Sequence, residues 1–270
     1  MKISEIVKAS NGKLESVEVE KNGVSLTGIC VQNADRQNCV SAVIYQEDVD
    51  RMTEDCETYE IAAEVVGNFL RERTGEVKYD FLGILSNPEE VAKRLQIRAM
   101  AEQNVPSKIT PAKIWNGIAF CYHIVFADVE DGAASLAPSD TIEEVKEKFG
   151  LSDSELWDLA VKNTEDISTI EENPIGLPMT ITSNKNAYFG ISGILVSEDF
   201  RKKALDKMGS AFYVIPSSIH EAILYGEGIA EASDLKKMHL EVQESAVAPT
   251  DRLTKNIFLC KENGELVVAA

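Results

Sequence analysis

A run of ten residues, Ile118 to Ala127 (IAFCYHIVFA), constrains the fold of this 270-residue chain more than any other segment. Its odd and even positions are both largely apolar, so a strand built from it would be buried on both faces. Such a strand must lie in the middle of a sheet, with other elements packed against each side. The Asp131-Gly132 pair then predicts a turn, after which Ala133–Leu136 can pair back.

The sequence before this strand predicts a hairpin and two helices. Asn22-Gly23 lies between two strand-like runs and is typical of a tight hairpin turn. The apolar spacing within Ile61–Leu70 predicts a long amphipathic helix. Asn87-Pro88 is a typical helix start, and we expect that helix to run to about Gln103. The expected inward residues of the two helices are Ile61, Ala62, Val65, Val66, Phe69, Leu70, Val91, Leu95 and Ala99.

Two acidic helices and a linker should follow the buried strand. The first helix begins near Thr141 with a Thr141/Glu144 capping box, and the second begins at Ser152 with a Ser152/Glu155 box. Residues 168–178 contain two prolines and show no periodicity, which predicts a linker.

The last ninety residues predict a β-β-α-β-β-α-β-β order, with strands over 179–183 and 188–196 and a helix capped by Ser197. Strands and helices interleave without a regular βαβ rhythm, so the predicted class is α+β, with mixed or antiparallel sheets packed against amphipathic helices. This leaves room for two subdomains. The expected division is an N-terminal α+β region over 1–167, a linker over 168–178 and a C-terminal region over 179–270.

The charge balance is 45 acidic against 27 basic residues, a formal net charge of −18. The excess is concentrated in residues 47–60 and 139–173. A field of this sign repels phosphate groups, which disfavours direct binding of nucleic acid or of an anionic membrane. It favours a basic protein partner, although an acidic surface can also serve solubility alone. The candidate binding residues in the second segment are Glu143, Glu144, Glu147 and Asp153.

The five cysteines are odd in number and scattered, and with three histidines they give no zinc-ligand spacing. Gly190–Gly193 lacks the features of a phosphate-binding loop. We therefore expect no metal, no cofactor and reduced thiols, as in a cytoplasmic protein. His123, inside the buried strand, is expected to be a hydrogen-bonded core residue, and His239 a residue at the core boundary.

Three short segments of the C-terminal half carry a resemblance: TSNKNAYFG at 182–190, PSSIHE at 216–221 and VAP at 247–249. The KNGVSLTGI hairpin at 21–29 and the LWDLAVKNT helix near 156–164 also fit, so the resemblance covers nearly the whole chain. The matching residues are Asn184, Lys185, Phe189, Gly190, Pro216, Ser217, Ser218, His220, Glu221, Val247, Ala248 and Pro249. This pattern resembles a family of uncharacterised proteins of gut Firmicutes, designated only as a domain of unknown function. The resemblance implies an accessory cytoplasmic role on plasmids and conjugative elements, and it brings no activity with it.

The PSSIHE segment holds the candidate catalytic residues Ser217, Ser218, His220 and Glu221. An extended backbone would put Ser218 and His220 on one face and Glu221 on the other, whereas a helical turn would bring Ser217 beside His220 and Glu221. The structural alternative is a polar turn with a Ser218/Glu221 capping box and a locally bonded His220. Asn184 and Lys185, in the TNK-type turn, are candidate binding residues.

Two functional hypotheses follow. The first is a non-enzymatic interaction or regulatory module, accessory to a mobile element, that binds a basic protein of the host or of the element. Counter-defence by mimicry of a nucleic acid is a narrower version of it. The alternative is a hydrolase-type or transferase-type enzyme that uses the PSSIHE segment.

Overall fold

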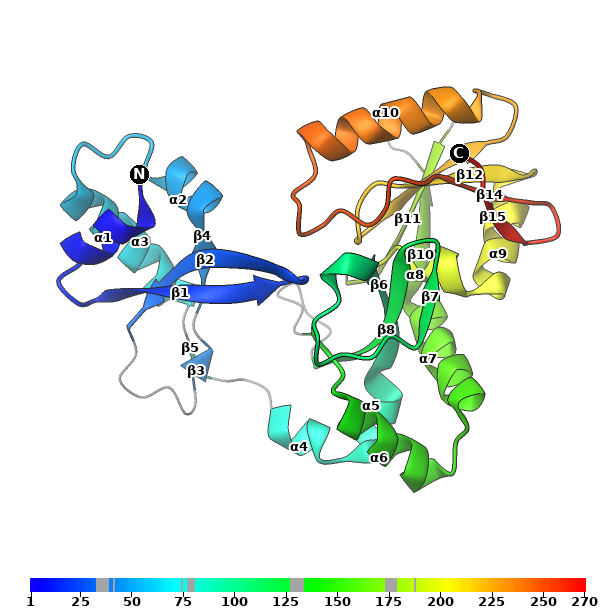
Figure 1. Ribbon diagram of the computed structural model, residues 1–270, viewed down its shortest axis with the longest axis horizontal. Helices are drawn as coiled ribbons and strands as arrows, with labels where there is room; N and C mark the ends of the chain where they lie inside the picture. Colours follow the sequence, from blue (N-terminus) through cyan, green and yellow to red (C-terminus); the bar gives the residue numbers. More distant parts are fainter. Residues whose placement is uncertain are drawn as a thin grey trace. The chain divides into compact units, whose positions relative to one another are not determined.

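The computed structural model describes residues 1–32, 39–40, 42–73, 75–76, 81–126, 134–172, 179–186 and 188–270. Contacts divide the chain into two compact units, Met1–Asp80 and Phe81–Ala270. Each unit combines helices with antiparallel sheets, which confirms the predicted α+β class (Figure 1). No helix among the described residues is long and apolar enough to cross a lipid bilayer.

The first unit packs helices against a small sheet. β1 (Leu14–Lys21) and β2 (Val24–Val31) form the predicted hairpin, and Asn22 and Gly23 both have the positive φ of its turn, 52° and 74°. β4 extends this sheet beside β2. The other elements of the unit are α1 (Ile3–Ala9), β3 (Cys39–Val40), β4 (Ile44–Tyr45), α2 (Gln46–Met52), α3 (Tyr59–Arg73) and β5 (Gly75–Glu76).

Helix α3 turns a different face to the core than the spacing predicts. Its buried residues include Ala62, Val66 and Leu70, but the side chains of Ile61 and Val65 are 45% and 37% exposed. The buried face continues instead through Ala63 and Gly67. The buried stripe is therefore rotated away from the larger side chains of Ile61 and Val65.

The first sheet of the second unit is built around β8 (Ile118–Val125), in which every residue is buried, as predicted. β6 (Leu95–Ala101) pairs along its whole length. β7 (Lys113–Trp115) and β9 (Ala134–Leu136) pair with opposite ends of β8 along its other edge. The pairing of β9 confirms the expected return of the chain after the buried strand.

The second sheet has six strands in the order β10-β11-β13-β12-β14-β15. The strands are β10 (Ser168–Glu172), β11 (Met179–Asn184), β12 (Phe212–Pro216), β13 (Ala222–Gly226), β14 (Phe258–Cys260) and β15 (Leu266–Val268). β10 pairs with β11, so the first part of the expected linker is a strand of this sheet, while residues 173–178 lie outside the described part of the chain. The contact division into two units falls at 80/81, and both the first sheet and this second sheet belong to the unit Phe81–Ala270.

Helices cover both sheets, and one apolar core that includes Ile97, Phe120, Leu156, Phe212 and Phe258 joins the two. The helices are α4 (Phe81–Leu85), α5 (Pro88–Arg94), α6 (Ser139–Phe149), α7 (Asp153–Ile167), α8 (Ser192–Val196), α9 (Glu198–Met208) and α10 (Ala232–Ser245). The side chains of Asn87, Ser152 and Ser197 cap α5, α7 and α9 as predicted, and Ser152 forms the full capping box with Glu155.

The helix expected to run to Gln103 ends at Arg94, and its second half is strand β6. Val91, Leu95 and Ala99 are four residues apart, a spacing that suits one face of a helix and also one face of a strand. Because β6 is buried on both faces, its residues between these positions are inside the protein too.

Two further sequence predictions are wrong. The expected strand over 188–196 is a turn followed by α8, because Phe189 has a positive φ of 57° that interrupts an extended backbone. The expected Thr141 capping box does not form, since α6 begins at Ser139 directly after Pro138 and Thr141 already lies in its first turn.

Candidate functional site

Two of the three motif segments, 182–190 and 216–221, meet around His220, together with Asp251, which follows the third segment. The Phe189 N–H donates to Nδ1 of His220 at 3.1 Å, and the Ser183 hydroxyl donates to the His220 carbonyl at 2.9 Å. From the segment after α10, the Asp251 carbonyl accepts the N–H of Ile219 at 2.9 Å. We call Ser183, Phe189, His220 and Asp251 the motif cluster.

The His220 ring is not placed to act as a general base. Its Nδ1 accepts the Phe189 N–H, so a neutral ring carries its proton on Nε2, which lies 3.8 Å from Oδ1 of Asp251. Neither nitrogen then offers a free lone pair to a nucleophile. Among the described hydrogen bonds, no hydroxyl of Ser217 or Ser218 reaches the ring, so the nucleophile–base pair that covalent catalysis needs is not formed here.

The PSSIHE segment forms a turn between β12 and β13. The Ser218 hydroxyl accepts the N–H of His220 at 3.0 Å, and the Ser218 N–H donates to the Glu221 carbonyl at 3.2 Å. Because no helix begins there, the expected Ser218/Glu221 capping box does not form, whereas the local bonding of His220 does. The Ser217 carbonyl accepts from the Gln243 side chain of α10 at 2.6 Å.

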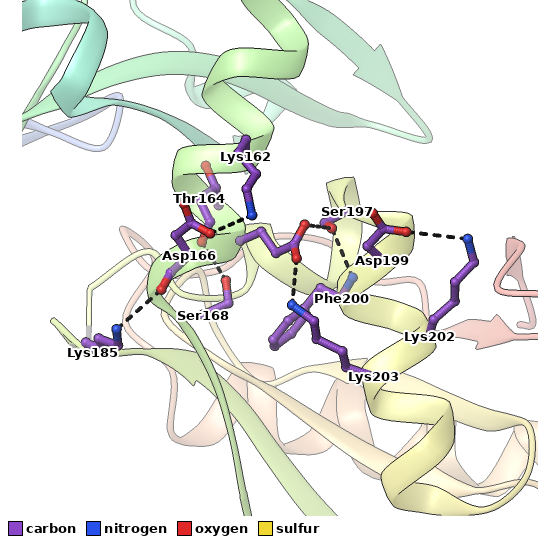
Figure 2. A network of polar contacts seen from close by, with 11 residues as sticks. Lys162, Thr164, Asp166, Ser168, Lys185, Ser197, Asp199, Phe200, Lys202 and Lys203 are labelled. Atoms are coloured by element: carbon purple, nitrogen blue, oxygen red, sulfur yellow. Dashed lines mark hydrogen bonds and ion pairs between the residues drawn. The ribbon is translucent and has the colours of Figure 1, made fainter.

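Asn184 and Lys185 hold a turn together. Nδ2 of Asn184 donates to the Tyr188 carbonyl at 2.7 Å, and its Oδ1 accepts the N–H of Asn186 at 2.9 Å. The Lys185 ammonium donates to the backbone carbonyl of Asp166 at 3.3 Å (Figure 2). Both candidate binding residues therefore make contacts that fix the backbone, as Asx turns do.

Figure 2 also shows how the end of α7 is joined to α9. Glu165 accepts from the Lys203 ammonium at 2.7 Å and from the Ser197 hydroxyl at 2.9 Å, and Ser197 in turn caps α9 through the Phe200 N–H. Hydrogen bonds from both partners lower the pKa of Glu165. Glu165 of α7 is thus joined to α9 through Lys203 and through the capping residue Ser197.

A buried polar pair lies beside the motif cluster. The Arg98 guanidinium sits 3.7 Å from the centre of the Phe189 ring, and burial lowers its pKa to about 10. His123 is only 3% exposed, and burial, helped by the charge of Arg98, lowers its pKa to about 3. Its Nδ1 has no hydrogen-bond partner in the described part of the chain, so it is less fully bonded than expected. His239 is buried too, not at the boundary as predicted, with Nε2 2.9 Å from the Thr254 carbonyl.

A cavity of about 500 Å³ opens at a break in the edge of the first sheet. β9 ends opposite His123, with the Ala137 N–H still bonded to the Tyr122 carbonyl, and β7 begins opposite Phe120, so neither strand lies opposite Cys121. We call this cavity the edge hollow. It is lined by Thr110, Pro111, Ala112, Lys113, Tyr122, Ala137, Ser139, Ile142, Glu143, Asp153, Ser154, Leu156 and Trp157.

The edge hollow combines carboxylates with aromatic rings. Glu143 and Asp153, two of the candidate binding residues, share the Lys146 ammonium at 3.1 and 2.7 Å, and the Asp153 side chain remains 91% exposed. Burial, reinforced by the charge of Asp153, raises the pKa of Tyr122 to about 12. On the other side, the Lys113 ammonium lies 3.8 Å from the centre of the Trp157 ring. The site thus attracts cations at two points.

The other two acidic candidates lie beside the hollow and do not line it. Glu144 and Glu147 are exposed on α6, and neither forms an ion pair with another described residue. The other acidic segment, residues 47–60, belongs to the first unit. The four cysteines whose side chains are described, Cys30, Cys56, Cys121 and Cys260, are free thiols.

A second cavity, of about 650 Å³, shares Lys113 and Trp157 with the edge hollow. We call it the tryptophan groove, because both tryptophans of the chain line it. Trp115 stacks on Phe258 with ring centres 4.9 Å apart. The groove is lined by Lys113, Ile114, Trp115, Phe120, Trp157, Leu195, Val196, Glu198, Arg201, Asn263, Gly264, Glu265 and Leu266. The sequence analysis does not predict this groove, although tryptophan is enriched at interfaces and the chain has two tryptophans.

Residues 165–261 match the model of a family of unknown function (DUF5688). This match agrees with the resemblance of the C-terminal half to an uncharacterised domain family. No curated protein and no solved structure matches the chain. The matched segment contains the motif cluster, whereas every residue lining the edge hollow precedes it.

Proposed function

We propose that the chain is an interaction module that binds a positively charged segment of a partner protein at the edge hollow. One observation carries the proposal: two carboxylates, Glu143 and Asp153, and two aromatic rings, Tyr122 and Trp157, line a single open cavity. A guanidinium or ammonium group can pair with the carboxylates and lie against the aromatic faces at the same time.

The cations already present support this chemistry. Lys146 bridges the two carboxylates, and Lys113 lies over Trp157, so each half of the hollow holds a positive group of the chain itself. The first contact is an ion pair with two exposed carboxylates and the second is a cation–π contact; both are of small net energy, so an incoming basic segment can exchange them at little cost. Glu144 and Glu147, which are exposed on α6 and form no ion pair within the described part of the chain, would draw such a segment toward the hollow.

The class of partner is a basic protein, of the host or of a mobile element. The same acidic surface would compete with a nucleic acid for a basic site on that partner, which is the counter-defence version of the proposal. A catalytic role for the PSSIHE segment is the weaker hypothesis, because the ring nitrogens of His220 face Phe189 and Asp251.

Calorimetry with a defined basic probe tests the proposal. The probe is a ten-residue peptide of alternating arginine and valine, titrated at low and at high salt. We expect binding at low salt that weakens as salt screens the carboxylates. The Glu143→Gln/Asp153→Asn double variant should lose about tenfold in affinity, the effect of removing roughly 1.4 kcal/mol of interaction.

The matched control is Glu241→Gln/Glu244→Gln, which removes two exposed carboxylates from α10. This variant should bind the peptide within about twofold of the original chain, because surface charges far from the site are largely screened. An equal loss in both double variants, or no binding at low salt, would overturn the proposal.

A further inference from the structure

We infer that the basic segment binds as an extended strand that pairs with the free edge of β7 and runs from the edge hollow into the tryptophan groove. This inference rests on the proposed function and specifies its binding mode. Strand addition obtains affinity from main-chain hydrogen bonds and specificity from pockets that take alternate side chains.

The register of β7 leaves hydrogen-bonding groups free. β7 and β8 are joined by the two-residue turn Asn116-Gly117, whose φ values are 50° and 78°. In such a hairpin the pair beside the turn, Trp115 and Ile118, exchanges both of its backbone hydrogen bonds. The next residue, Ile114, faces Ala119 as a non-hydrogen-bonded pair, so its N–H and C=O point away from β8.

The surroundings of Ile114 are open to an added strand. Its side chain is 54% exposed, the most of the large apolar side chains whose exposure is described. β7 lies at the outer edge of the first sheet, beside β8 in Figure 1. β7 has three residues, one of which is a lysine, so it is too short and too charged to promote aggregation by edge-to-edge pairing.

The two cavities lie where the side chains of such a strand would need them. Lys113 lines both cavities, so a segment along β7 passes from one to the other. Alternate side chains of a paired strand point to the same face as Lys113 and Trp115. On that face the tryptophan groove offers the apolar side chains of Leu195, Val196 and Leu266.

Charge decides between the occupants of this edge. Glu143 and Asp153 lie at one end and Glu198 and Glu265 line the other, so a basic extended segment meets carboxylates along its path. Lys113 and Arg201 are the basic residues that line the two cavities, fewer than the four carboxylates, so a second copy of this chain would bring two acidic edges together. The edge of β7 is therefore better suited to a basic segment of another protein than to the same edge of a second copy.

Selective N-methylation of the arginine–valine peptide tests the binding mode. One peptide is methylated on the arginine amides and another on the valine amides. In a strand, successive amides point to opposite edges, so we expect one methylated peptide to lose about tenfold in affinity and the other to bind like the parent. Hydrogen exchange at the Ile114 amide, measured on the unaltered protein, should slow when the parent peptide binds.

The outcomes separate the two proposals. If the parent peptide binds with the expected salt dependence, but both methylated peptides bind equally well and Ile114 exchange is unchanged, strand addition is overturned and the proposed function stands. If the parent does not bind at low salt, both are overturned. If Ile114 is protected without peptide, in proportion to protein concentration, a second copy occupies the edge and the inference is wrong.

Discussion

The motif cluster and the edge hollow are both rich in polar side chains, but they use them differently. In the motif cluster the polar atoms bond to the protein itself, as with the Phe189 N–H on His220 and the Ser183 hydroxyl on its carbonyl. In the edge hollow, Asp153 and Glu143 pair with one lysine and keep most of their surface exposed. The cluster is within the segment that matches the family model, and the hollow precedes that segment.

Under the proposed function, this difference separates residues that hold the fold together from residues that remain available to a partner. A histidine between serines and a glutamate suggests catalysis in the sequence, yet its ring nitrogens face a backbone amide and a carboxylate. Carboxylates that look like an ordinary solvated surface in the sequence lie beside aromatic rings and an open cavity. The predictions below test whether the cluster is structural and the hollow is not.

The largest expected effect is the loss of stability in acid caused by His123, next to the motif cluster. Its pKa is 6.5 when unfolded and about 3 when folded. Between these values the unfolded chain binds a proton that the folded chain does not. The free energy of unfolding therefore falls as pH drops from about 6.5, by up to about 1.4 kcal/mol for each pH unit.

Urea unfolding of the original chain and of His123→Gln, measured between pH 7 and pH 4, checks this expectation. The variant should lose stability less steeply as the pH falls. Parallel slopes for the two proteins would show that His123 titrates normally in the folded state.

Gly190→Ala should destabilise the protein by about 2 kcal/mol, because an added Cβ would lie 2.6 Å from backbone atoms of Ser183 and Asn184. Gly67→Ala on α3 is the control, since the closest neighbour there is the flexible end of Arg71 at 3.2 Å. We expect this control to be neutral or slightly stabilising. Chemical denaturation measures both, and an unaffected Gly190→Ala would mean that the turn around the motif cluster is loosely packed.

His220→Ala removes the acceptor of the Phe189 N–H and should cost about 1.5 kcal/mol of unfolding free energy. Ser217→Ala is the comparison, because no described hydrogen bond involves the Ser217 hydroxyl, and its effect should stay below about 0.5 kcal/mol. Thermal and urea unfolding of both variants give the answer. A His220→Ala protein with unchanged stability and an abolished activity would assign the cluster to catalysis.

Local sequence signals predicted much of the fold correctly. The Asn22-Gly23 turn, the buried strand β8 and the caps at Ser152 and Ser197 each depend on a few neighbouring residues, whose chemistry suffices to specify them. The spacing predicts a helix where β6 lies, because residues four apart lie on one face of a helix and also on one face of a strand.

The sites could be predicted only in part. Glu143 and Asp153 were singled out for their charge, but nothing local shows that they share a cavity with Tyr122 and Trp157. That neighbourhood arises where β9 ends and β7 begins beside β8, which is a matter of pairing between distant segments. The contact of Phe189 with His220 likewise joins residues far apart in the sequence.

The smallest expected effect on stability belongs to the edge hollow. Glu143→Gln/Asp153→Asn should change the unfolding free energy by less than about 0.5 kcal/mol, because both carboxylates are exposed and their ion pairs with Lys146 are weak. Urea unfolding tests this directly. A loss above about 2 kcal/mol would make the hollow as structural as the motif cluster and remove the contrast between them.

Fluorescence of Trp157 tests the central claim, that the edge hollow binds a basic segment, most directly. In a Trp115→Phe variant Trp157 is the only tryptophan left in the chain. Titration of the arginine–valine peptide should change its emission with a midpoint equal to the dissociation constant that calorimetry gives for the same Trp115→Phe variant, because the peptide's cations meet the ring that Lys113 now covers. The change should require about tenfold more peptide in the Glu143→Gln/Asp153→Asn background. Emission that stays constant while the peptide binds would place the partner elsewhere and contradict the account.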